Sequence, residues 1–495
     1  MFRKFLIALF TTCLTTSLLA YDFTMPTAEG QNLFYTVLSD SSVEVAAFTS
    51  HKSDNNYVEG ELFIPSEVEY LYQTYQVVGI GDQAFANCSK MQSVSIPESV
   101  TYINRQAFAG CKALSSVQVP DQVTLLGDSA FALCSGLESV QLGRELTHIG
   151  KYAFSGCSSL RSVSTGLAVQ SIDNYAFDGC SSLSDFIIPA SVTHLGLRAF
   201  RFCSSLTSAT LPYGLDYIAE GLFQSCTSLR MVIASNNIAE IKRLAFQNCQ
   251  SLAVINMPDS LKVIGDNAFH SCSSLPSITL PQGVSRIGKS AFERCEGLQI
   301  VDLSASQLTT IEMGVFAYCP QIHTVKFPQQ LVSIGSVAFT RCTTLSKVEL
   351  PENVTEIGAA AFRECSGINT LVLPRCISVI EPEAFKYCSS LAKVRIFNPV
   401  PPQADESVFY NNPVHTLYVP LGSAELYASS LPWSRIGNIE EFDAGSASIS
   451  AFTADPSDLP VYDLQGRPVG SASSSSIPSL APGFYSIGGR KVMKY

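Results

Sequence analysis

The sequence is poor in charged side chains and in the residue types that carry most enzyme chemistry. Of its 495 residues, 15% are Asp, Glu, Lys or Arg, six are histidine and one is tryptophan. The charge is also unbalanced, with 42 acidic residues against 31 basic ones and a formal net charge of -11. This acidic balance keeps a protein soluble and argues against a polyanion, so we expect no nucleic-acid partner.

Motifs of catalysis and metal binding are missing as well. The sequence contains no Gly-x-Ser-x-Gly, no phosphate loop, no His-Glu-x-x-His, no acidic calcium loop and no Cys-x-x-Cys. His148 and His194 share a repeat position but lie two repeats apart, and Glu381 with Glu383 suits a solvent-exposed face. We therefore predict that the protein is not an enzyme, with no catalytic residue, no metal site and no cofactor.

Long hydrophobic runs are absent after the first 20 residues. No later stretch has 18 or more apolar residues, so the sequence predicts no transmembrane helix in the mature chain. Arg3 and Lys4 precede the apolar run 5–10, and a polar stretch then leads to Ala20, as in a secretory signal peptide. We predict that residues 1–20 are a signal peptide and that the protein is extracellular or on the outer-membrane surface.

One repeated pattern dominates the rest of the chain. Fourteen copies place an Ala-Phe-like pair, a cysteine three residues after the Phe, and then Leu, Val and Leu-Pro at fixed offsets. The Phe residues are 23 apart, with one slip of a single residue, at positions 85, 108, 131, 154, 177, 200, 223, 246, 269, 292, 316, 339, 362 and 385. Such self-similarity is the signature of a repeat architecture, in which each repeat packs on its neighbours.

Each repeat divides into a strand and two turns. Val348-Glu349-Leu350 is apolar at alternate positions and is ended by Pro351, which predicts a short strand. A turn with Ile357-Gly358 follows, where glycine permits a close approach of the chain. We expect the Ala-Phe-x-x-Cys piece to form a short helical or 3-10 turn on the outer side.

Fourteen of the 16 cysteines occupy one repeat column. In parallel rungs about 4.8 Å apart their side chains point the same way, which makes the torsion of a disulfide hard to reach. We predict a buried ladder of thiols that pack as small hydrophobic groups, with a disulfide framework as the alternative. Outside the column are Cys13, in the signal, and Cys376, which we place at a core position otherwise held by Val or Leu.

The pattern Cys-x-x-Leu-x-x-Val-x-Leu-Pro-x-x-Val-x-x-Ile-Gly-x-x-Ala-Phe resembles the spirochaete-type leucine-rich repeat of BspA-like bacterial surface proteins, over residues 80–396. The resemblance implies an α/β repeat solenoid: a right-handed leucine-rich repeat superhelix with one long parallel β-sheet, 14 rungs of about 23 residues, capped at both ends. It also implies a non-catalytic role in adhesion or protein binding, with a host matrix or cell-surface protein as ligand. The sequence does not specify an oligomeric state.

The flanking regions predict separate parts. We expect an N-terminal β cap at 21–79, the repeat solenoid at 80–396, a C-terminal cap at 397–440 and a linker at 441–459 rich in Ala, Ser, Gly and Asp. Residues 460–495 hold strand-like pieces at 461–464, 484–487 and 491–493. This tail resembles the C-terminal sorting tails of type IX secretion, and a terminal hairpin without a sorting role is the alternative.

Binding is expected on the solvent-facing strand positions, five and seven residues after each cysteine. These positions are small and polar in the first rungs, apolar in the middle and basic toward the end. Our candidate partner-binding residues are Ile187, Met231, Ile233, Val254, Ile300, Lys326, Lys347, Lys393 and Arg395. The alternative is that the aliphatic residues only favour the strand. A carbohydrate-binding module is the second functional hypothesis, ranked lower because these two columns contain no aromatic residue.

Overall fold

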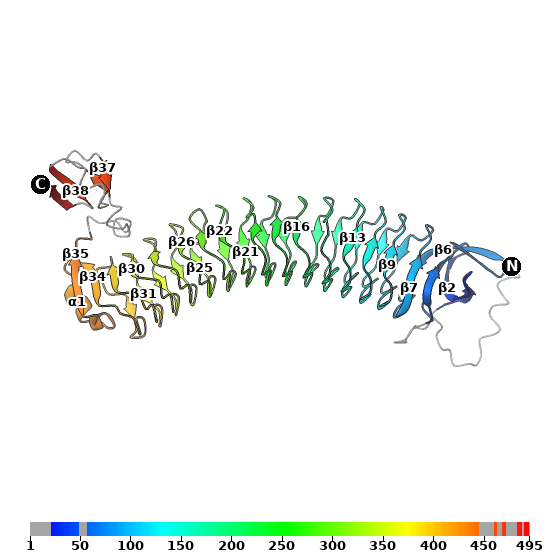
Figure 1. Ribbon diagram of the computed structural model, residues 1–495, viewed down its shortest axis with the longest axis horizontal. Helices are drawn as coiled ribbons and strands as arrows, with labels where there is room; N and C mark the ends of the chain where they lie inside the picture. The colour runs from blue at the N-terminus through cyan, green and yellow to red at the C-terminus, as the bar shows by residue number, and fades with distance from the viewer. Residues whose placement is uncertain are drawn as a thin grey trace, which may run out of the picture. The chain divides into compact units, whose positions relative to one another are not determined.

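The protein is a parallel β-solenoid, as the sequence predicts, with about 16 turns of about 23 residues and little helix. The computed structural model describes residues 21–48 and 57–444, together with the strands at 460–462, 468–471, 483–487 and 490–494. The chain divides into two units, one holding the described residues up to 215 with 225–227, the other residues 216–224 and those from 228 onward. Within each unit successive coils lie side by side in chain order (Figure 1).

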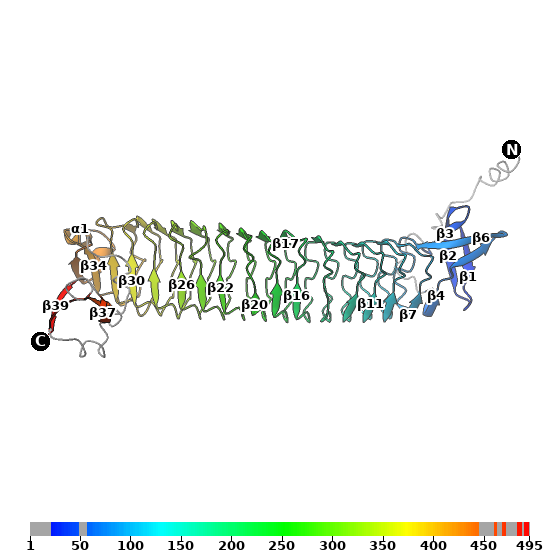
Figure 2. The same ribbon diagram turned by 90° about the horizontal axis from the view of Figure 1, so that it is seen from above.

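The first unit begins with strands that cover the first coil. They are β1 (Phe23–Pro26), β2 (Asn32–Ser39), β3 (Ser42–Val45), β4 (Glu59–Phe63), β5 (Glu67–Tyr70) and β6 (Gln73–Ile80). The first three pair antiparallel in order, β5 and β6 form a hairpin, and β6 runs parallel to β3. Figure 2 shows β4 beside β7, the first strand of the repeats, and these two pair in parallel. The side-chain amide of Gln31 donates to the carbonyls of Glu59 and Glu61. These hydrogen bonds cover the outer edge of β4.

The coils of the first unit contribute strands to two parallel ladders, except that the coil at 185–190 forms no strand in the first ladder. The Val-x-Leu segments form β7 (Lys90–Ser95), β9 (Ser116–Gln118), β11 (Ser139–Gln141), β13 (Ser162–Ser164) and β16 (Ser208–Thr210). The second ladder is made by the pairs that precede the Gly position, β8 (Tyr102–Ile103), β10 (Leu125–Leu126), β12 (His148–Ile149), β14 (Ser171–Ile172) and β15 (His194–Leu195), and it continues from β6. The sequence indicated only a turn at these pairs, because two residues are too few to show an alternation.

The second unit repeats this arrangement. Its Val-x-Leu strands are β18 (Met231–Ile233), β20 (Val254–Ile255), β22 (Ser277–Thr279), β24 (Ile300–Asp302), β26 (Thr324–Lys326), β28 (Lys347–Glu349), β30 (Thr370–Leu373) and β32 (Lys393–Ile396). Its second ladder comprises β17 (Tyr217–Ile218), β19 (Glu240–Ile241), β21 (Val263–Ile264), β23 (Arg286–Ile287), β25 (Thr310–Ile311), β27 (Ser333–Ile334), β29 (Glu356–Ile357), β31 (Val379–Ile380) and β33 (Gln403–Ala404).

The repeated apolar columns form the core between the two ladders. Phe85, Phe108 and Phe131 are fully buried, and the centroids of their stacked rings lie 5.1 and 5.0 Å apart. The same stacking recurs in the second unit, where Phe246 and Phe269 are 5.2 Å apart. Offset stacked rings at this separation attract one another beyond the gain from burial alone. The Phe column therefore ties each rung to the next.

The Ala-Phe-x-x-Cys piece is a series of β-turns, so our expectation of a helical or 3-10 turn was wrong. The residues two before and two after each Phe lie in the left-handed region, for example Gln83 at φ 57° and Asn87 at φ 62°. Few of these positions hold glycine. Hydrogen bonds between rungs hold the strained backbone, since the N–H groups of Gln83 and Asn87 donate to Arg105 and Ala109 carbonyls at 2.9 and 2.6 Å.

The column cysteines are buried, free thiols, as predicted, and no disulfide occurs among the described residues. They do more than fill space, because each thiol from Cys111 onward can donate to the Phe carbonyl of the preceding rung. Cys111 contacts the Phe85 oxygen at 3.2 Å and Cys272 the Phe246 oxygen at 3.2 Å. In the last coil Asn412 replaces the cysteine, and its amide donates to the Phe385 oxygen at 2.8 Å.

Cys376 does not occupy a core position, contrary to our expectation. It is exposed, and the neighbouring Ile377 fills the apolar column. The error came from the alignment of the repeat: the core residue lies three positions after the strand-ending Pro374, which is Ile377 and not Cys376.

The C-terminal end of the second unit closes on β34 (Thr416–Pro420), α1 (Ala424–Ala428), the 3-10 helix η1 (Trp433–Arg435) and β35 (Asn438–Phe442). Trp433 is fully buried and donates its indole N–H to the Pro402 carbonyl at 3.2 Å.

The tail strands are β36 (Pro460–Tyr462), β37 (Pro468–Ser471), β38 (Gly483–Ile487) and β39 (Arg490–Lys494), an antiparallel sheet in the order β37-β36-β38-β39. The predicted signal peptide and residues 445–459 of the predicted linker lie outside the described residues.

Candidate functional site

An exposed apolar strip lies on the outer face of β18 and β20 in the second unit. Met231 pairs directly with Val254 across the two strands, and Ile233 follows on the same face of β18. These side chains are 40%, 56% and 46% exposed, whereas Val232 between them is fully buried. The alternation follows the pleat, so the strand register that we assumed holds here. We name Met231, Ile233 and Val254 the apolar strip.

Ile300 and Ile187 are exposed as expected but do not belong to the strip. Ile300 lies on β24 and is 41% exposed, and the intervening β22 presents the polar residues Ser277 and Thr279. Ile187 belongs to the first unit, where it is 86% exposed.

The predicted basic end of the same unit is largely neutralised by neighbouring groups. Lys326 lies 2.9 Å from the Asp302 carboxylate, and Lys347 pairs with Glu349. Partial burial alone would raise the pKa of Asp302, but hydrogen bonds from Ser304 and Lys326 outweigh it and hold that pKa below its usual value.

The two remaining basic candidates differ in exposure. Lys393 is exposed, while Arg395 is half-buried between the rings of Tyr418 and Phe442, at 4.9 and 5.2 Å from their centroids. Burial lowers the pKa of Arg395. The candidate residues therefore present mainly apolar side chains to a partner.

A groove of about 880 Å³ opens on the outer face of the first unit. Its floor is formed by solvent-facing residues of β9, β11 and β13, and its far wall by the segment 185–190. Ile187 and Leu167 both line it and are 86% and 88% exposed. The sequence pointed to Ile187 but not to Leu167, because Leu167 lies ten residues after its cysteine, beyond the two solvent-facing strand columns.

The groove exists because the sheet is interrupted. β13 is the edge strand of the three-stranded sheet β9-β11-β13, and the next coil touches it only through an isolated bridge between Ser162 and Asp185. Phe186 takes the place of the small aliphatic residue at the centre of this rung. Its ring is buried against Phe177 and Phe200, with centroids 5.0 and 5.2 Å away. The rung that carries this ring forms no strand beside β13.

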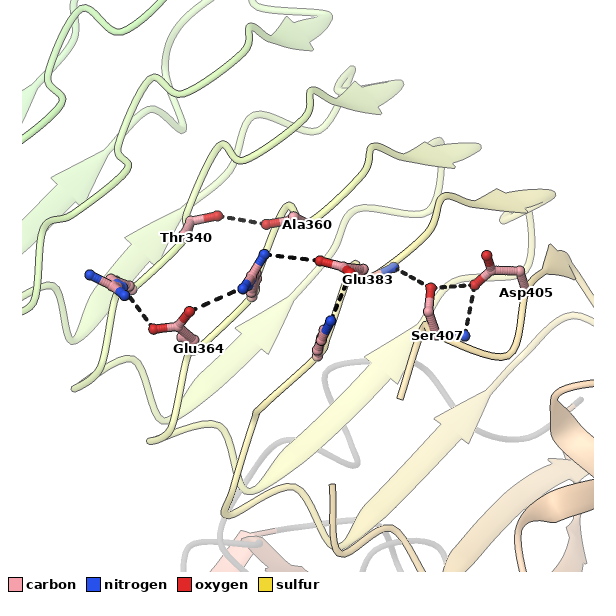
Figure 3. Close-up of polar contacts among 9 residues, drawn as sticks. Thr340, Ala360, Glu364, Glu383, Asp405 and Ser407 are labelled. Carbon is pink, nitrogen blue, oxygen red and sulfur yellow. Dashed lines mark hydrogen bonds and ion pairs between the residues drawn. The ribbon is translucent and has the colours of Figure 1, made fainter. Parts of the chain in front are cut away.

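Charged side chains of the second unit gather over the turns that carry the Phe and Cys columns (Figure 3). The sequence suggested only solvent-exposed residues here. Glu364 accepts from Arg341 at 2.7 Å and lies 3.3 Å from Arg363. Glu383 continues the chain of ion pairs, 3.0 Å from Arg363 and 2.7 Å from Lys386. The hydrogen bond from Lys386 holds the pKa of Glu383 below its usual value. The acids and bases satisfy one another, so this face offers little net charge to a partner.

No arrangement of catalytic or metal-binding groups is present among the described residues. His148 and His194 approach Asp173 from the rungs on either side, with Nε2 3.8 and 4.0 Å from its carboxylate. Within the described ranges, however, no group of three or more His, Cys, Asp or Glu side chains is placed to hold a metal ion. Burial raises the pKa of Cys88 and Cys295 to about 12, which suits structural rather than nucleophilic thiols. No helix among these residues is long and apolar enough to cross a membrane.

Comparison with known proteins assigns the repeats. A family model described as the BspA type leucine-rich repeat region matches residues 78–207, 198–322 and 309–431. Among solved structures, a leucine-rich repeat protein from Bacteroides ovatus is 28% identical, with 76% of this chain and 94% of that chain covered and a TM-score of 0.60. A leucine-rich cell surface protein from Faecalibacterium prausnitzii is 21% identical, with 86% and 96% covered and a TM-score of 0.37. No curated protein matches the chain.

Proposed function

Because the chain belongs to the family of BspA-type leucine-rich repeat proteins, we propose that it is a non-catalytic adhesion or protein-binding protein. It acts at the bacterial surface or outside the cell, and its ligand is a host matrix or cell-surface protein. The predicted signal peptide at 1–20 supports export. The resemblance of residues 460–495 to type IX sorting tails leads us to propose a sorting role after export.

The observation that carries this proposal is the apolar strip. Met231, Ile233 and Val254 expose large aliphatic side chains on adjoining strands of a rigid sheet, with polar residues on β22 beside them. Clustered apolar groups bordered by polar ones are the usual centre of a protein interface, where a few buried contacts supply most of the affinity. Burying them against a partner requires no rearrangement of the sheet.

Binding by full-length mature protein to a panel of purified extracellular matrix proteins tests the proposal, measured by surface plasmon resonance. The double substitution Met231→Asp with Ile233→Asp places two charges in the strip and should weaken binding about 30-fold or more. Both side chains already face solvent, so thermal stability should change little. The matched control is Ser277→Asp with Thr279→Asp, which puts the same charges in the same two columns of β22.

Retained binding by the strip variant would refute the assignment of this surface. An equal loss in the strip variant and in the control would show that added negative charge, and not loss of apolar contact, causes the effect. Failure of every matrix protein to bind the unmodified chain would argue against this class of ligand.

A further inference from the structure

The groove of the first unit has a floor of uncharged hydrogen-bonding groups. Each of three successive rungs offers one residue from each solvent-facing column: Ser116 and Gln118, Ser139 and Gln141, Ser162 and Ser164. All six side chains are exposed, and the strands that carry them pair in register. Hydroxyl and amide groups therefore recur along the groove at one strand spacing, about 4.8 Å. Asp185, at the far wall, is the one charged residue that lines it.

One rim of the groove is apolar and includes an aromatic residue in the neighbouring rung. Leu167 and Ala190 line the groove at the position ten residues after the cysteine, and Tyr213 holds the same position one rung further on. Leu167 and Tyr213 are 88% and 72% exposed. Leu167 and Ala190 thus form a rim beside the polar floor, and Tyr213 follows at the equivalent position of the next rung. Tyr213 lies outside the two solvent-facing strand columns, whose lack of aromatic residues disfavoured a carbohydrate ligand.

We infer that this groove binds a linear, uncharged oligosaccharide that lies across the rungs. Sugar rings combine many hydroxyl groups with a C–H face, which matches a floor of Ser and Gln side chains beside a rim of Leu and Tyr. In a β-1,4-linked chain of pyranoses each sugar advances by about one strand spacing and is turned over relative to the last, so every second sugar would meet equivalent floor residues. The volume of about 880 Å³ lies within the range of small-ligand sites.

The alternatives fit the groove less well. An extended peptide rises only about 3.3 Å per residue and would fall out of step with the rungs. A peptide lying across the rungs would also leave its own backbone groups facing side chains, because the strands beneath it pair with one another. An acidic glycan would need basic residues, and none lines this groove.

Titration calorimetry with the mature full-length chain tests the inference. The probes are the β-1,4-linked tetramers of N-acetylglucosamine and of glucose, with a tetramer of galacturonic acid as the charged comparison. We expect at least one neutral tetramer to bind and the acidic one not to bind. Ser139→Arg with Ser162→Arg, at two exposed floor positions, should abolish binding by filling the groove. Tyr213→Ala should weaken it about tenfold by removing the stacking surface, and Tyr213→Phe should retain it.

The variant Met231→Asp with Ile233→Asp separates this inference from the proposed function, because it alters only the apolar strip of the second unit. It should leave oligosaccharide binding unchanged. The inference fails if neither neutral tetramer binds at several millimolar, if the arginine variant binds as well as the original chain, or if the acidic tetramer binds more tightly. Loss of matrix-protein binding with retained oligosaccharide binding would support two independent sites.

Discussion

The β5–β6 hairpin should become more stable when its two exposed apolar tip residues are replaced. Leu71 and Tyr72 form the two-residue loop, since Tyr70 pairs directly with Gln73. Their φ angles are 51° and 65°, so both lie in the left-handed region that a type I′ turn requires. They are 76% and 101% exposed, so they gain little from packing. The chain accepts backbone strain here with no compensating contact of the tip side chains.

The magnitude follows from the two backbone positions. A bulky residue in the left-handed region costs about 1–2 kcal/mol. Glycine at position 72 removes this cost but loses about 0.5–1 kcal/mol through the entropy of its unfolded chain. Asparagine at position 71 tolerates the conformation and recovers a further fraction of a kilocalorie. Together, Leu71→Asn and Tyr72→Gly should stabilise the hairpin by about 1 kcal/mol.

Hydrogen exchange of β5 and the start of β6 measures this change locally, without depending on the unfolding of the whole chain. A gain of about 1 kcal/mol corresponds to roughly fivefold slower exchange of these amides. The control is Leu71→Ala with Tyr72→Ala, which removes the same apolar surface but keeps a Cβ at both left-handed positions. Exchange that is unchanged or faster in the Asn-Gly variant would refute the strain argument. Equal slowing in the Ala-Ala control would assign the effect to the side chains instead.

Three further predictions concern the thiols, the C-terminal cap and the tail. Thiol titration of the mature chain should detect one reactive cysteine when native, Cys376, and fifteen when denatured; fewer than fifteen would indicate disulfides. Backbone N–H groups of Ala424, Gly422 and Ser423 hold the pKa of Glu441 below its model-compound value of 4.5. Its contribution to stability is therefore complete above about pH 4.5 and is lost as the pH falls through the lowered pKa. Glu441→Gln should lower the urea midpoint reported by Trp433 fluorescence at neutral pH, and a variant midpoint equal to that of the original chain would contradict this. Deletion of residues 460–495 should reduce the amount of protein at the cell surface; an unchanged amount would exclude a sorting role for the tail.

The core could be predicted from the sequence because every repeat has apolar residues at the same core positions. Fourteen cysteines in one column, with Phe three residues before, leave little choice about which side chains face inward. The exposure of Ile233 and Val254 followed from the same register, since alternation in a strand places their neighbours in the core. Cys376 shows the limit of this reasoning, because a shift of one residue in the alignment was enough to place an exposed side chain in the core.

The turn conformations could not be predicted, because the signal that usually marks them is missing. Left-handed positions ordinarily select Gly or Asn, yet here they hold residues such as Tyr152 and Arg198, with φ of 55° and 52°. Hydrogen bonds from the adjacent rung impose this backbone, so the information lies in the stacking and not in the local sequence. The Leu71-Tyr72 turn also lacks Gly and Asn at its left-handed positions. Its backbone is fixed instead by the pairing of β5 with β6.

The two proposed sites arise from substitutions of different kinds. The apolar strip results from changes at solvent-facing positions of β18 and β20, which leave the backbone unaltered. The groove coincides with a core substitution, because Phe186 stands at the centre of the rung that forms no strand beside β13. A second buried ring behaves similarly: Phe327 lies two columns further along its repeat, and β26, although paired with β24, is also the last strand of its sheet. β20 also ends its sheet, with Ile255 at the strand centre, so a ring alone does not decide where the sheet is interrupted. Where a central ring and an interruption coincide, as at Phe186, the outer face carries a groove.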